Sequence, residues 1–372
     1  MKVIVIGAGA SGAVAAINYK RHNKGDDVLI IEHLDKPLKK LLATGNGKCN
    51  LGNAKIDFLR FNNPDFARKI IGNYDYKSLF ESVSIQTKLL DEYAYPVSES
   101  AVSVRDAFLK ECRKLGIKIN VEEQFIDFKA ENSIKVITNK NTYICDKLII
   151  SGGLYSSPKL GTDGSVFKVI EKHGYKTIKP EPGLSPLYTI EKTKLIDGIR
   201  IKAVVSIKEN GKKVHEEAGE VLFKDHGLSG IVIFNAMSII SRKPNSKFSI
   251  SLDLLPDFSV SYLAQYKNKH SFDEFLQAFV NPKISAYLKE RFNDNENKIF
   301  ESIKNLEFTF DKSFGFDFSQ VSVGGISVDE IDENMMSKRE KNVYFIGELL
   351  DIDGPCGGYN LTWAFASALR IK

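Results

Sequence analysis

The chain has 372 residues, of which 43% are hydrophobic and 27% are charged. A chain of this length and composition forms two or three domains with large cores, which excludes a small binding module and an intrinsically disordered protein. The net charge of +5 allows nucleic-acid contact without indicating a dedicated nucleic-acid-binding protein, and no apolar run approaches the roughly 20 residues that span a bilayer.

The four cysteines, Cys49, Cys112, Cys145 and Cys356, are widely spaced and form no CxxC pair. This spacing predicts free thiols, and it predicts neither a zinc site nor a disulfide framework. The N-terminal residues lack the basic flank and the short apolar core of an export signal. We therefore expect a cytoplasmic protein that uses neither a membrane nor a metal ion.

The first glycine-rich stretch lies between two predicted strands, residues 2–6 and 28–32, with a predicted helix between them. It has the spacing GxGxxG, at Gly7, Gly9 and Gly12. In a β-α-β unit the first glycine turns the chain, the second lets a pyrophosphate approach the backbone, and the third lets helix and strand pack closely. The pattern therefore predicts a dinucleotide whose phosphates lie at the helix N-terminus.

An acidic residue, Glu32, ends the second of these strands. At this position a carboxylate can accept hydrogen bonds from both ribose hydroxyls of an adenosine dinucleotide, and its charge would repel a 2′-phosphate. The strands, the helix and the acid together favour a dinucleotide site over a turn that serves packing alone. They do not decide between FAD and NAD.

The second glycine-rich stretch, residues 41–50 (LLATGNGKCN), follows three lysines, Lys36, Lys39 and Lys40. It offers backbone donors next to positive charge. Such a loop can wrap an anionic pyrophosphate or the polar edge of a flavin, and it can equally be a solvated turn.

A third stretch begins with residues 143–150, which are predicted to form one apolar strand, and ends with Ser151, Gly152 and Gly153. The glycines indicate a bend where the strand passes close to something bulky. A plain β-turn is the alternative reading.

The middle of the chain changes character at three prolines, Pro180, Pro182 and Pro186. Alternating stretches such as residues 201–207 then predict strands, and residues 256–305 have a helical pattern with a capping box at Ser271-Phe-Asp-Glu274. The expected domains are 1–183 with 326–372 for dinucleotide binding, 184–255 with 306–325 for a β-rich substrate domain, and 256–305 for a helical insert.

The C-terminal part repeats the order of strand, glycines and helix. A strand over residues 343–346 leads through the glycine-rich residues 347–361 to a helix over residues 362–369. A helix N-terminus presents free amides and a positive dipole. A reduced flavin carries negative charge near its pyrimidine edge, so this helix end is a matching electrostatic partner.

Seven segments resemble one flavoprotein family: VIVIGAGASGAVAA, KLLATGNGKCN, LIISGG, HGLSG, VSVGGISVDEID, MMSKR and YFIGELLDIDGPCGGYNLTWAFASA. In this order, over nearly the whole chain, they are similar to the BaiN/RdsA-like NAD(P)/FAD-dependent oxidoreductases. LLATGNGKCN and DGPCGGYNL are more specific than GxGxxG. The resemblance implies an α/β fold, in which a glutathione-reductase-type FAD-binding Rossmann domain is interrupted by a β-rich, barrel-like domain with a small helical subdomain.

The resemblance also implies which residues hold FAD. The N-terminal motif would hold the ADP half, the second and last glycine-rich stretches would line the flavin, and Phe125 would supply a backbone contact on the adenine side. Lys48 stands where the family has arginine. A lysine offers a single point charge in place of the bidentate contact of an arginine. The residues implied are Gly7, Gly9, Ala10, Ser11, Gly12, Glu32, His33, Thr44, Gly45, Asn46, Gly47, Lys48, Cys49, Asn50, Phe125, Ser151, Gly152, Gly153, Gly347, Glu348, Asp353, Gly354, Gly357, Gly358, Tyr359, Asn360 and Leu361.

Only one convincing dinucleotide fingerprint is present, at the N-terminus, where such proteins bind FAD. NAD(P)H would therefore dock transiently over the flavin and leave before the acceptor enters, which predicts ping-pong kinetics. The flavin supplies hydride chemistry, so the protein has to hold the acceptor roughly 3–3.5 Å from the flavin N5 atom and donate a proton.

Reduction of an enone-like C=C bond requires an acid at the carbon that receives the proton. The candidates are Cys49, Cys356, Tyr359 and His226. The two cysteines can also be small residues that fill tight backbone space, or a redox disulfide. His226 lies in the polar turn 226–230. It is either simply exposed or, by the resemblance, faces the cofactor cleft. Gly324-Gly325 likewise either has no functional role or lies where the chain returns towards the flavin.

The resemblance points to a conjugated double bond as the substrate. It is either the uracil ring of a uridine in ribosomal RNA, reduced to dihydrouridine, or a small steroid-like enone. The slightly basic balance favours RNA, whereas the lack of a basic or aromatic-rich binding module limits that preference. A non-catalytic FAD-binding assembly factor is the alternative from another class.

Overall fold

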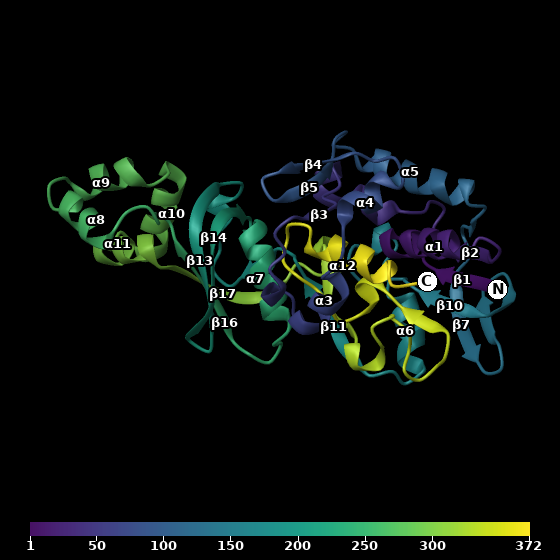
Figure 1. Cartoon of the computed structure of the whole chain (residues 1–372). Coiled ribbons are helices and arrows are strands. Elements are labelled where there is room, and N and C mark those ends of the chain that lie inside the picture. Colours follow the sequence, from purple (N-terminus) through teal and green to yellow (C-terminus); the bar gives the residue numbers. More distant parts are fainter. The chain divides into compact units, whose positions relative to one another are not determined.

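The protein is described here by a computed structural model of residues 1–372, and it divides into two compact units. The first unit comprises Met1–Glu181 and Gln320–Lys372, and the second comprises Pro182–Ser319. Figure 1 shows the chain coloured from its N-terminus to its C-terminus, and both ends belong to the first unit. The first unit is therefore interrupted by the second.

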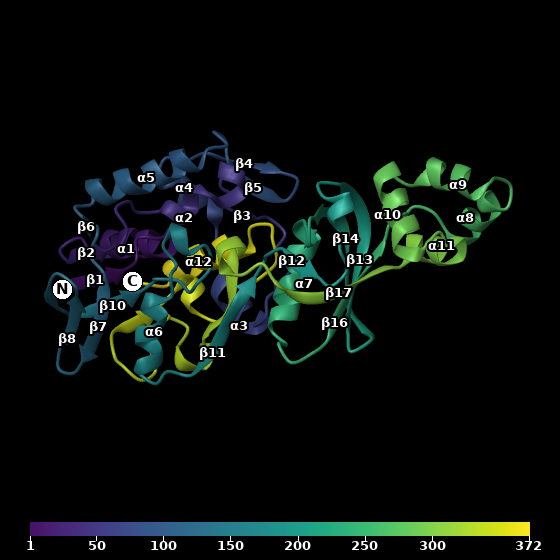
Figure 2. The same ribbon diagram turned by 180° about the vertical axis from the view of Figure 1, so that it is seen from behind.

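A five-stranded parallel sheet, in the order β19-β10-β1-β2-β6, forms the centre of the first unit. Four of its strands, β1, β2, β10 and β19, are mainly apolar because they are covered on both faces. Helices α1 and α5 lie on one side, and the small sheet of β7, β8 and β9 lies on the other (Figures 1 and 2). The bounds are β1 (Lys2–Ile6), β2 (Asp27–Ile31), β6 (Lys118–Asn120), β10 (Lys147–Ile150), β19 (Val343–Phe345), α1 (Ala10–His22) and α5 (Ala101–Lys114).

The other elements of the first unit surround this sheet. Three antiparallel strands pair as β3-β5-β4, three more as β7-β8-β9, and β11 pairs with β18. The strands are β3 (Gly52–Asn53), β4 (Thr87–Leu90), β5 (Tyr93–Pro96), β7 (Phe125–Ala130), β8 (Ile134–Thr138), β9 (Thr142–Cys145), β11 (Thr177–Gly183) and β18 (Val321–Ile326). The helices are α2 (Lys39–Leu42), α3 (Pro64–Ile71), α4 (Tyr76–Glu81), α6 (Ser165–Lys172) and α12 (Tyr359–Ala368).

The prediction of one strand over residues 143–150 is wrong. The chain forms two strands there, β9 in the antiparallel sheet and β10 beside β1 in the parallel sheet. Asp146, between them, donates its backbone N–H to Lys2 O (2.8 Å), and its carboxylate accepts from Lys2 N (2.7 Å). These two hydrogen bonds fix the point where the chain passes from one sheet to the other. No local sequence pattern predicts them.

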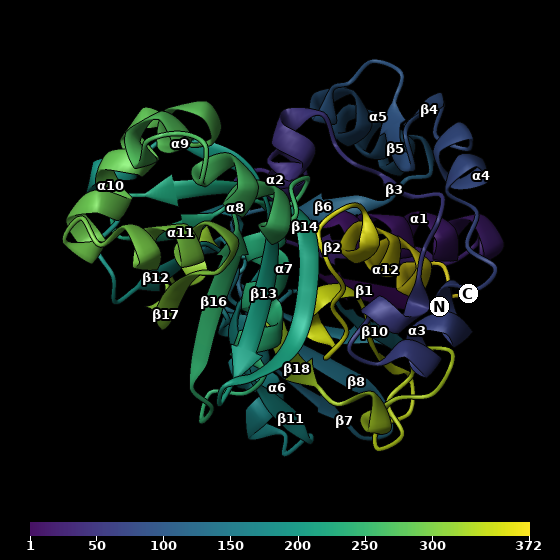
Figure 3. The same ribbon diagram turned by 90° about the vertical axis from the view of Figure 1, so that its left-hand side faces the viewer.

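The second unit is built on a closed barrel in the order β12-β15-β14-β13-β16-β17, which confirms the predicted barrel-like domain. Four helices, α8 to α11, share its hydrophobic core, and their ribbons lie together in Figure 3. The bounds are β12 (Leu187–Thr189), β13 (Arg200–Glu209), β14 (Lys212–Lys224), β15 (Gly227–Ser229), β16 (Phe248–Asp253), β17 (Leu306–Ser313), α7 (Ile231–Ser241), α8 (Val260–Lys267), α9 (Phe272–Phe279), α10 (Pro282–Phe292) and α11 (Glu296–Lys304).

Two local predictions in this unit have different outcomes. The capping box is present at the start of α9, where Ser271 and Glu274 exchange side-chain and backbone hydrogen bonds. The polar turn expected at residues 226–230 is wrong over most of its length, because Gly227–Ser229 forms strand β15 of the barrel. Barrel closure pairs this short segment on both sides, and so overrides its turn-like composition.

The structure also bears on membrane spans, metal sites and disulfides. No helix combines the length with the apolar character that crossing a membrane requires. No group of three or more His, Cys, Asp or Glu side chains is placed to hold a metal ion. All four cysteines are free, so Cys49 and Cys356 form no disulfide in this structure.

Candidate cofactor site

The three glycines of the N-terminal motif have different surroundings. Gly7 has φ +93°, and a Cβ on it would lie 2.9 Å from Ser151 O. A Cβ on Gly12 would lie only 2.0 Å from Gly7 O, so α1 approaches the turn more closely than a side chain permits. A Cβ on Gly9 would meet no atom within 4 Å. Packing thus explains Gly7 and Gly12, whereas the open space at Gly9 is free for a ligand.

The N-terminus of α1 faces this open space without a cap. Gly9 is the N-cap residue and supplies no side chain, and the first turn contains no acidic residue. The free amides and the positive end of the helix dipole therefore suit an anion. The arrangement fits the pyrophosphate of a dinucleotide.

Glu32 is oriented by the same motif. Its Oε2 accepts from Ala8 N (2.8 Å), and its Oε1 accepts from Leu34 N (2.9 Å) and lies 3.1 Å from His33 Nδ1. The hydrogen bond to Glu32 is the main reason why the pKa of His33 is raised. A carboxylate oxygen can accept two hydrogen bonds, so Oε2 can still accept one from a ribose hydroxyl.

A second buried carboxylate, Glu123, lies close to Glu32 in the same unit. Its backbone N–H donates to Glu32 O (2.9 Å), and it lies two residues before the buried Phe125. The carboxylate accepts hydrogen bonds from four side chains: Thr138 Oγ1 (2.6 Å), Tyr143 Oη (2.8 Å), Asn120 Nδ2 (2.9 Å) and Asn141 Nδ2 (3.3 Å). Burial by itself would raise the pKa of Glu123, but these hydrogen bonds outweigh burial and lower it.

The lowered pKa predicts how stability depends on pH. Because the folded-state pKa lies below the ordinary value of 4.5, the Glu123 carboxylate stabilises the fold above pH 4.5, and this contribution disappears as the pH falls through the folded-state pKa. We expect Glu123→Gln to cost roughly 1–3 kcal/mol at pH 7, because an NH2 group replaces one of the two accepting oxygens, and much less near pH 3. Urea unfolding of both proteins at the two pH values measures this difference.

The neighbouring Glu122 provides the matched control. Its side chain is exposed, so Glu122→Gln should change the free energy of unfolding by no more than about 0.5 kcal/mol at either pH. A destabilisation by Glu123→Gln that is equally large at pH 3 and pH 7 would contradict the assigned role of the carboxylate charge.

The loop after α2 has an unusual backbone. Gly45, Asn46, Gly47 and Cys49 all have positive φ, between +55° and +83°. A Cβ on Gly45 would lie 2.8 Å from Asn50 N, whereas one on Gly47 would meet nothing within 4 Å. Thr44, at the start of the loop, donates its hydroxyl to Leu41 O (2.7 Å). The loop is therefore tightly folded at one glycine and open at the other.

Two side chains of this loop are already engaged within the protein. Cys49 is completely buried, and burial raises the pKa of its thiol to about 11. Lys48 Nζ lies 2.7 Å from Glu99 Oε2, and this hydrogen bond raises the pKa of Lys48. Lys48 is half-exposed, so its ammonium reaches solvent as well as Glu99. Lys48 therefore carries its charge next to a carboxylate of the protein itself.

The bend at residues 151–153 has a packing explanation. Ser151 Oγ donates to Ile6 O (2.7 Å), and a Cβ on Gly152 would lie 2.4 Å from a methyl carbon of Val166. Gly153 has φ +67°, and a Cβ on it would lie 2.6 Å from Thr162. Both glycines thus allow the chain to pass α6 and the residues before it. Their contact with FAD stays a prediction.

The C-terminal glycine-rich stretch is held rigidly. Asn360 accepts from Gly354 N (3.0 Å) and donates to Gly354 O (2.8 Å). A Cβ on Gly358 would lie 2.4 Å from Gly52 C, and one on Gly357 would lie 2.8 Å from the ring of Tyr93. The loop therefore closes against β3 and β5 so tightly that only glycine fits.

Helix α12 begins directly after this loop, and its N-terminus also has no side-chain cap. Thr362, in its first turns, is 2% exposed, and its Oγ1 has no hydrogen-bond partner. A buried hydroxyl without a partner costs free energy, so a bound group that pairs with it would be favoured. Free amides, a positive helix end and this hydroxyl fit the polar edge of a flavin, and Thr362 was not among the residues predicted from the sequence.

The four candidate proton donors have different environments. Cys356 is partly exposed, and its Sγ lies 3.9 Å from Gln320 Oε1. Tyr359 is buried, and its hydroxyl accepts from Asp57 N (3.2 Å). Cys49 is fully buried, whereas the His226 side chain is 59% exposed in the second unit. Within the first unit, Cys356 is thus the accessible candidate.

Several other predicted residues lie in well-defined places. Both carboxylate oxygens of Glu348 bind other groups of the protein. Asp353 is buried, and its N–H donates to Asn62 Oδ1 (2.9 Å). Gly324 and Gly325 both have positive φ, and Cβ atoms on them would lie 2.6 Å from Lys179 O and 2.7 Å from Leu349 O. Close packing therefore accounts for these two glycines.

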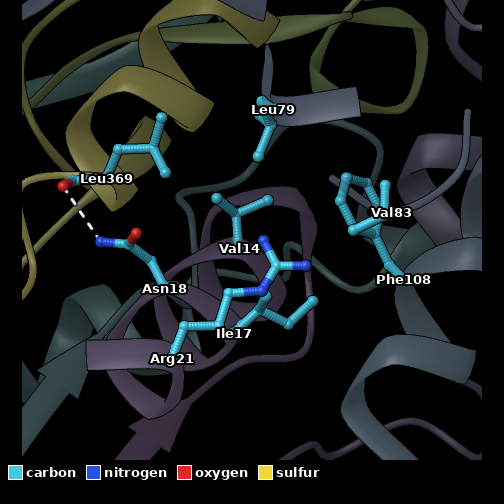
Figure 4. A pocket seen from close by; sticks show the side chains of 8 residues that line it. All are labelled: Val14, Ile17, Asn18, Arg21, Leu79, Val83, Phe108 and Leu369. Carbon is cyan, nitrogen blue, oxygen red and sulfur yellow. Dashed lines mark hydrogen bonds between the residues drawn. The ribbon is translucent and has the colours of Figure 1, made fainter. Parts of the chain in front are cut away.

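A small pocket on another face of α1 is distinct from this site (Figure 4). Its polar groups are satisfied, because Asn18 Nδ2 donates to Leu369 O (3.1 Å) and Arg21 pairs with Glu111 (2.8 Å). None of the glycine motifs lines it. The lining residues are Val14, Ile17, Asn18, Arg21, Leu79, Val83, Phe108 and Leu369.

Comparison with known proteins identifies the family. The family model described as the HI0933-like protein Rossmann domain matches residues 1–371. The chain belongs to the HI0933-like family. This match, together with the names of the relatives below, confirms the predicted membership of the BaiN/RdsA-like flavoproteins and the predicted class of FAD-dependent oxidoreductase.

Two curated relatives of this HI0933-like protein cover nearly its whole length. It is 29% identical over 397 residues to a 3-dehydro-bile acid delta(4,6)-reductase of Clostridium scindens, with 98% of this chain and 97% of the relative covered. It is 27% identical over 394 residues to the ribosomal RNA dihydrouridine synthase of Escherichia coli K12, with 98% and 95% covered.

A solved structure supports the fold. The 3-ketosteroid delta1-dehydrogenase of Sterolibacterium denitrificans is 12% identical and superposes with a TM-score of 0.51, with 99% of this chain and 98% of that chain covered. At this identity the likeness concerns the fold alone. It agrees with the predicted glutathione-reductase-type FAD fold.

Proposed function

We propose that this HI0933-like protein uses FAD to reduce a carbon–carbon double bond that is conjugated to a carbonyl group, with NAD(P)H as the transient electron donor. The observation that carries the proposal is the pair of full-length relatives, one named a bile acid reductase and the other a dihydrouridine synthase. Dihydrouridine is uridine with its C5=C6 bond saturated, and that bond is conjugated to a ring carbonyl. The two named activities therefore both involve a C=C bond that is conjugated to a carbonyl group.

Residues of the first unit bind FAD and supply the proton. The amides at the start of α1 bind the pyrophosphate, and Glu32 accepts hydrogen bonds from the ribose. The amides at the start of α12 and the Thr362 hydroxyl bind the polar edge of the flavin. When bound, FAD supplies hydride transfer. Cys356 holds at its Sγ the proton that the second carbon of the double bond receives.

For the substrate, we propose a uridine of ribosomal RNA first and a small steroid-like enone second. The second candidate is supported by the 29% identity to the bile acid reductase. A strain of E. coli that lacks its ribosomal RNA dihydrouridine synthase distinguishes them. We expect expression of this chain to restore dihydrouridine in ribosomal RNA, measured by mass spectrometry of nucleosides.

The control uses the same strain, and purified protein is used to test the alternatives. A Gly9→Ala variant, for which we expect FAD binding to be about 100-fold weaker, should restore less of the modification. Rapid bleaching of the flavin by NADH or NADPH in stopped flow separates an enzyme from a non-catalytic assembly factor. If bleaching occurs but ribosomal RNA stays unmodified, conjugated steroid enones become the substrates to assay, and if no bleaching occurs the enzymatic proposal fails.

A further inference from the structure

A cluster of charged and hydroxyl side chains lies between the glycine-rich stretches of the first unit. Lys40 Nζ is 2.6 Å from Glu348 Oε2 and 2.6 Å from Ser156 Oγ. Glu348 Oε1 accepts from Ser322 N (2.9 Å) and from the Ser156 hydroxyl. Ser322 Oγ in turn accepts from Ser156 N (3.1 Å). Lys40, Glu348, Ser156 and Ser322 thus form one closed hydrogen-bonded network.

The network joins chain segments that are far apart in sequence. Lys40 is 116 residues from Ser156 and 308 residues from Glu348. Lys40 lies in α2, which leads into the loop of residues 44–50, Ser156 follows the bend at 151–153, and Glu348 opens the C-terminal glycine-rich stretch. The charged pair, together with Ser156, therefore links the three stretches that are expected to surround FAD.

The pair also adjoins the phosphate end of the site. Leu38, just before α2, donates its N–H to Ala8 O in the N-terminal motif (2.8 Å). Gly347, next to Glu348, packs so closely on the first turn of α1 that a Cβ on it would lie 2.5 Å from Ser11 Oγ. A shift of either charged residue would thus be transmitted to the backbone that lines the pyrophosphate.

Burial makes this pair different from an ordinary surface ion pair. The side chains of Lys40 and Glu348 are 24% and 22% exposed, and Ser156 is completely buried. Exposed pairs contribute little, whereas removing one partner of a largely buried pair leaves an uncompensated charge. The three segments would then separate or take in water.

We infer that Lys40 and Glu348 act as positioning residues, which hold the three glycine-rich stretches in the arrangement that binds FAD. The inference rests on the FAD site proposed above. Neither residue needs to take part in the chemistry. Their effect is on cofactor affinity and on the environment of the bound flavin.

The test is a double-mutant cycle with Lys40→Met, Glu348→Gln and the double variant. Each apoprotein is titrated with FAD, and the dissociation constant is read from flavin fluorescence. We expect each single substitution to weaken FAD binding by 10- to 100-fold. The double variant should be no weaker than the worse single variant, because the second substitution removes a charge that has already lost its partner. Lys40→Arg, which keeps the charge, should recover most of the affinity.

A second Lys–Glu–Ser group, in the barrel unit, is the matched control. Glu209 accepts from Lys243 (2.5 Å) and from Ser246 (2.7 Å). Lys243→Met and Glu209→Gln should leave the FAD dissociation constant unchanged. The visible spectrum of the bound flavin provides a second readout, since its fine structure near 450 nm should weaken in the Lys40 and Glu348 variants and persist in the controls.

The outcomes separate this inference from the proposed function. If the parent protein binds no FAD, the proposed function fails. If the parent binds FAD and the Lys40 and Glu348 variants bind it within threefold of the parent, the positioning role is refuted. Additive effects of the two substitutions on the FAD dissociation constant also refute it, because Lys40 and Glu348 would then act independently. If the variant apoproteins are unfolded by circular dichroism, the two residues are needed for folding itself. That result would also refute the positioning role.

Discussion

The Gly9→Ala variant is expected to fold as the parent does and to lose FAD affinity by about 100-fold. The added methyl group meets no atom within 4 Å in the structure, and the backbone at Gly9 (φ −78°, ψ −171°) is one that any residue adopts. The stability of the apoprotein should therefore not change. The methyl group occupies the space through which the pyrophosphate reaches the amides of α1, and losing one or two charge-assisted hydrogen bonds of about 1.5–3 kcal/mol each accounts for the effect.

Thermal unfolding of the apoprotein and titration with FAD measure the two quantities separately. Gly12→Ala is the contrasting variant, because its Cβ would lie 2.0 Å from Gly7 O. That substitution should lower the melting temperature of the apoprotein itself. If Gly9→Ala binds FAD as tightly as the parent, the phosphates do not lie at the start of α1, and the site described here is misplaced.

The contrast between these glycines shows what the sequence can predict. The β-α-β unit was recognisable because its strands, turn and helix are contiguous and each follows a local pattern. The close packing at Gly12 was also predictable, because the geometry of the motif recurs in many proteins. The role of Gly9 in pyrophosphate binding stays a prediction. The family motifs extended this prediction to the C-terminal stretch and to the barrel domain.

Features that depend on distant partners were not predictable. The division of residues 143–150 into β9 and β10 depends on hydrogen bonds between Asp146 and Lys2. The pairing of Lys40 with Glu348 depends on a contact across 308 residues, so in the sequence Lys40 stands out only as one of three nearby lysines. Thr362 was missed because a threonine in a helix carries no signal that its hydroxyl is buried without a partner.

The substitution Cys356→Ala is expected to lower kcat for reduction of the acceptor by 100- to 10,000-fold, the range typical for loss of a general acid. Reduction of the flavin by NAD(P)H and the FAD dissociation constant should stay unchanged, because neither depends on the proton given to the acceptor. The choice among the candidates rests on access. Cys356 is partly exposed, whereas the Cys49 thiol is buried with its pKa raised to about 11, and the Tyr359 hydroxyl is directed to Asp57 N.

Half-reactions measured in stopped flow distinguish this role from a structural one. Cys112→Ala is the matched control, since this thiol is free and completely buried in α5, outside the site, and its loss should affect stability more than turnover. Equal slowing of both half-reactions by Cys356→Ala would indicate a displaced flavin and not a missing acid. Full turnover in Cys356→Ala would leave His226 as the exposed candidate, because a buried hydroxyl or thiol reaches an acceptor only if the loops that cover it move.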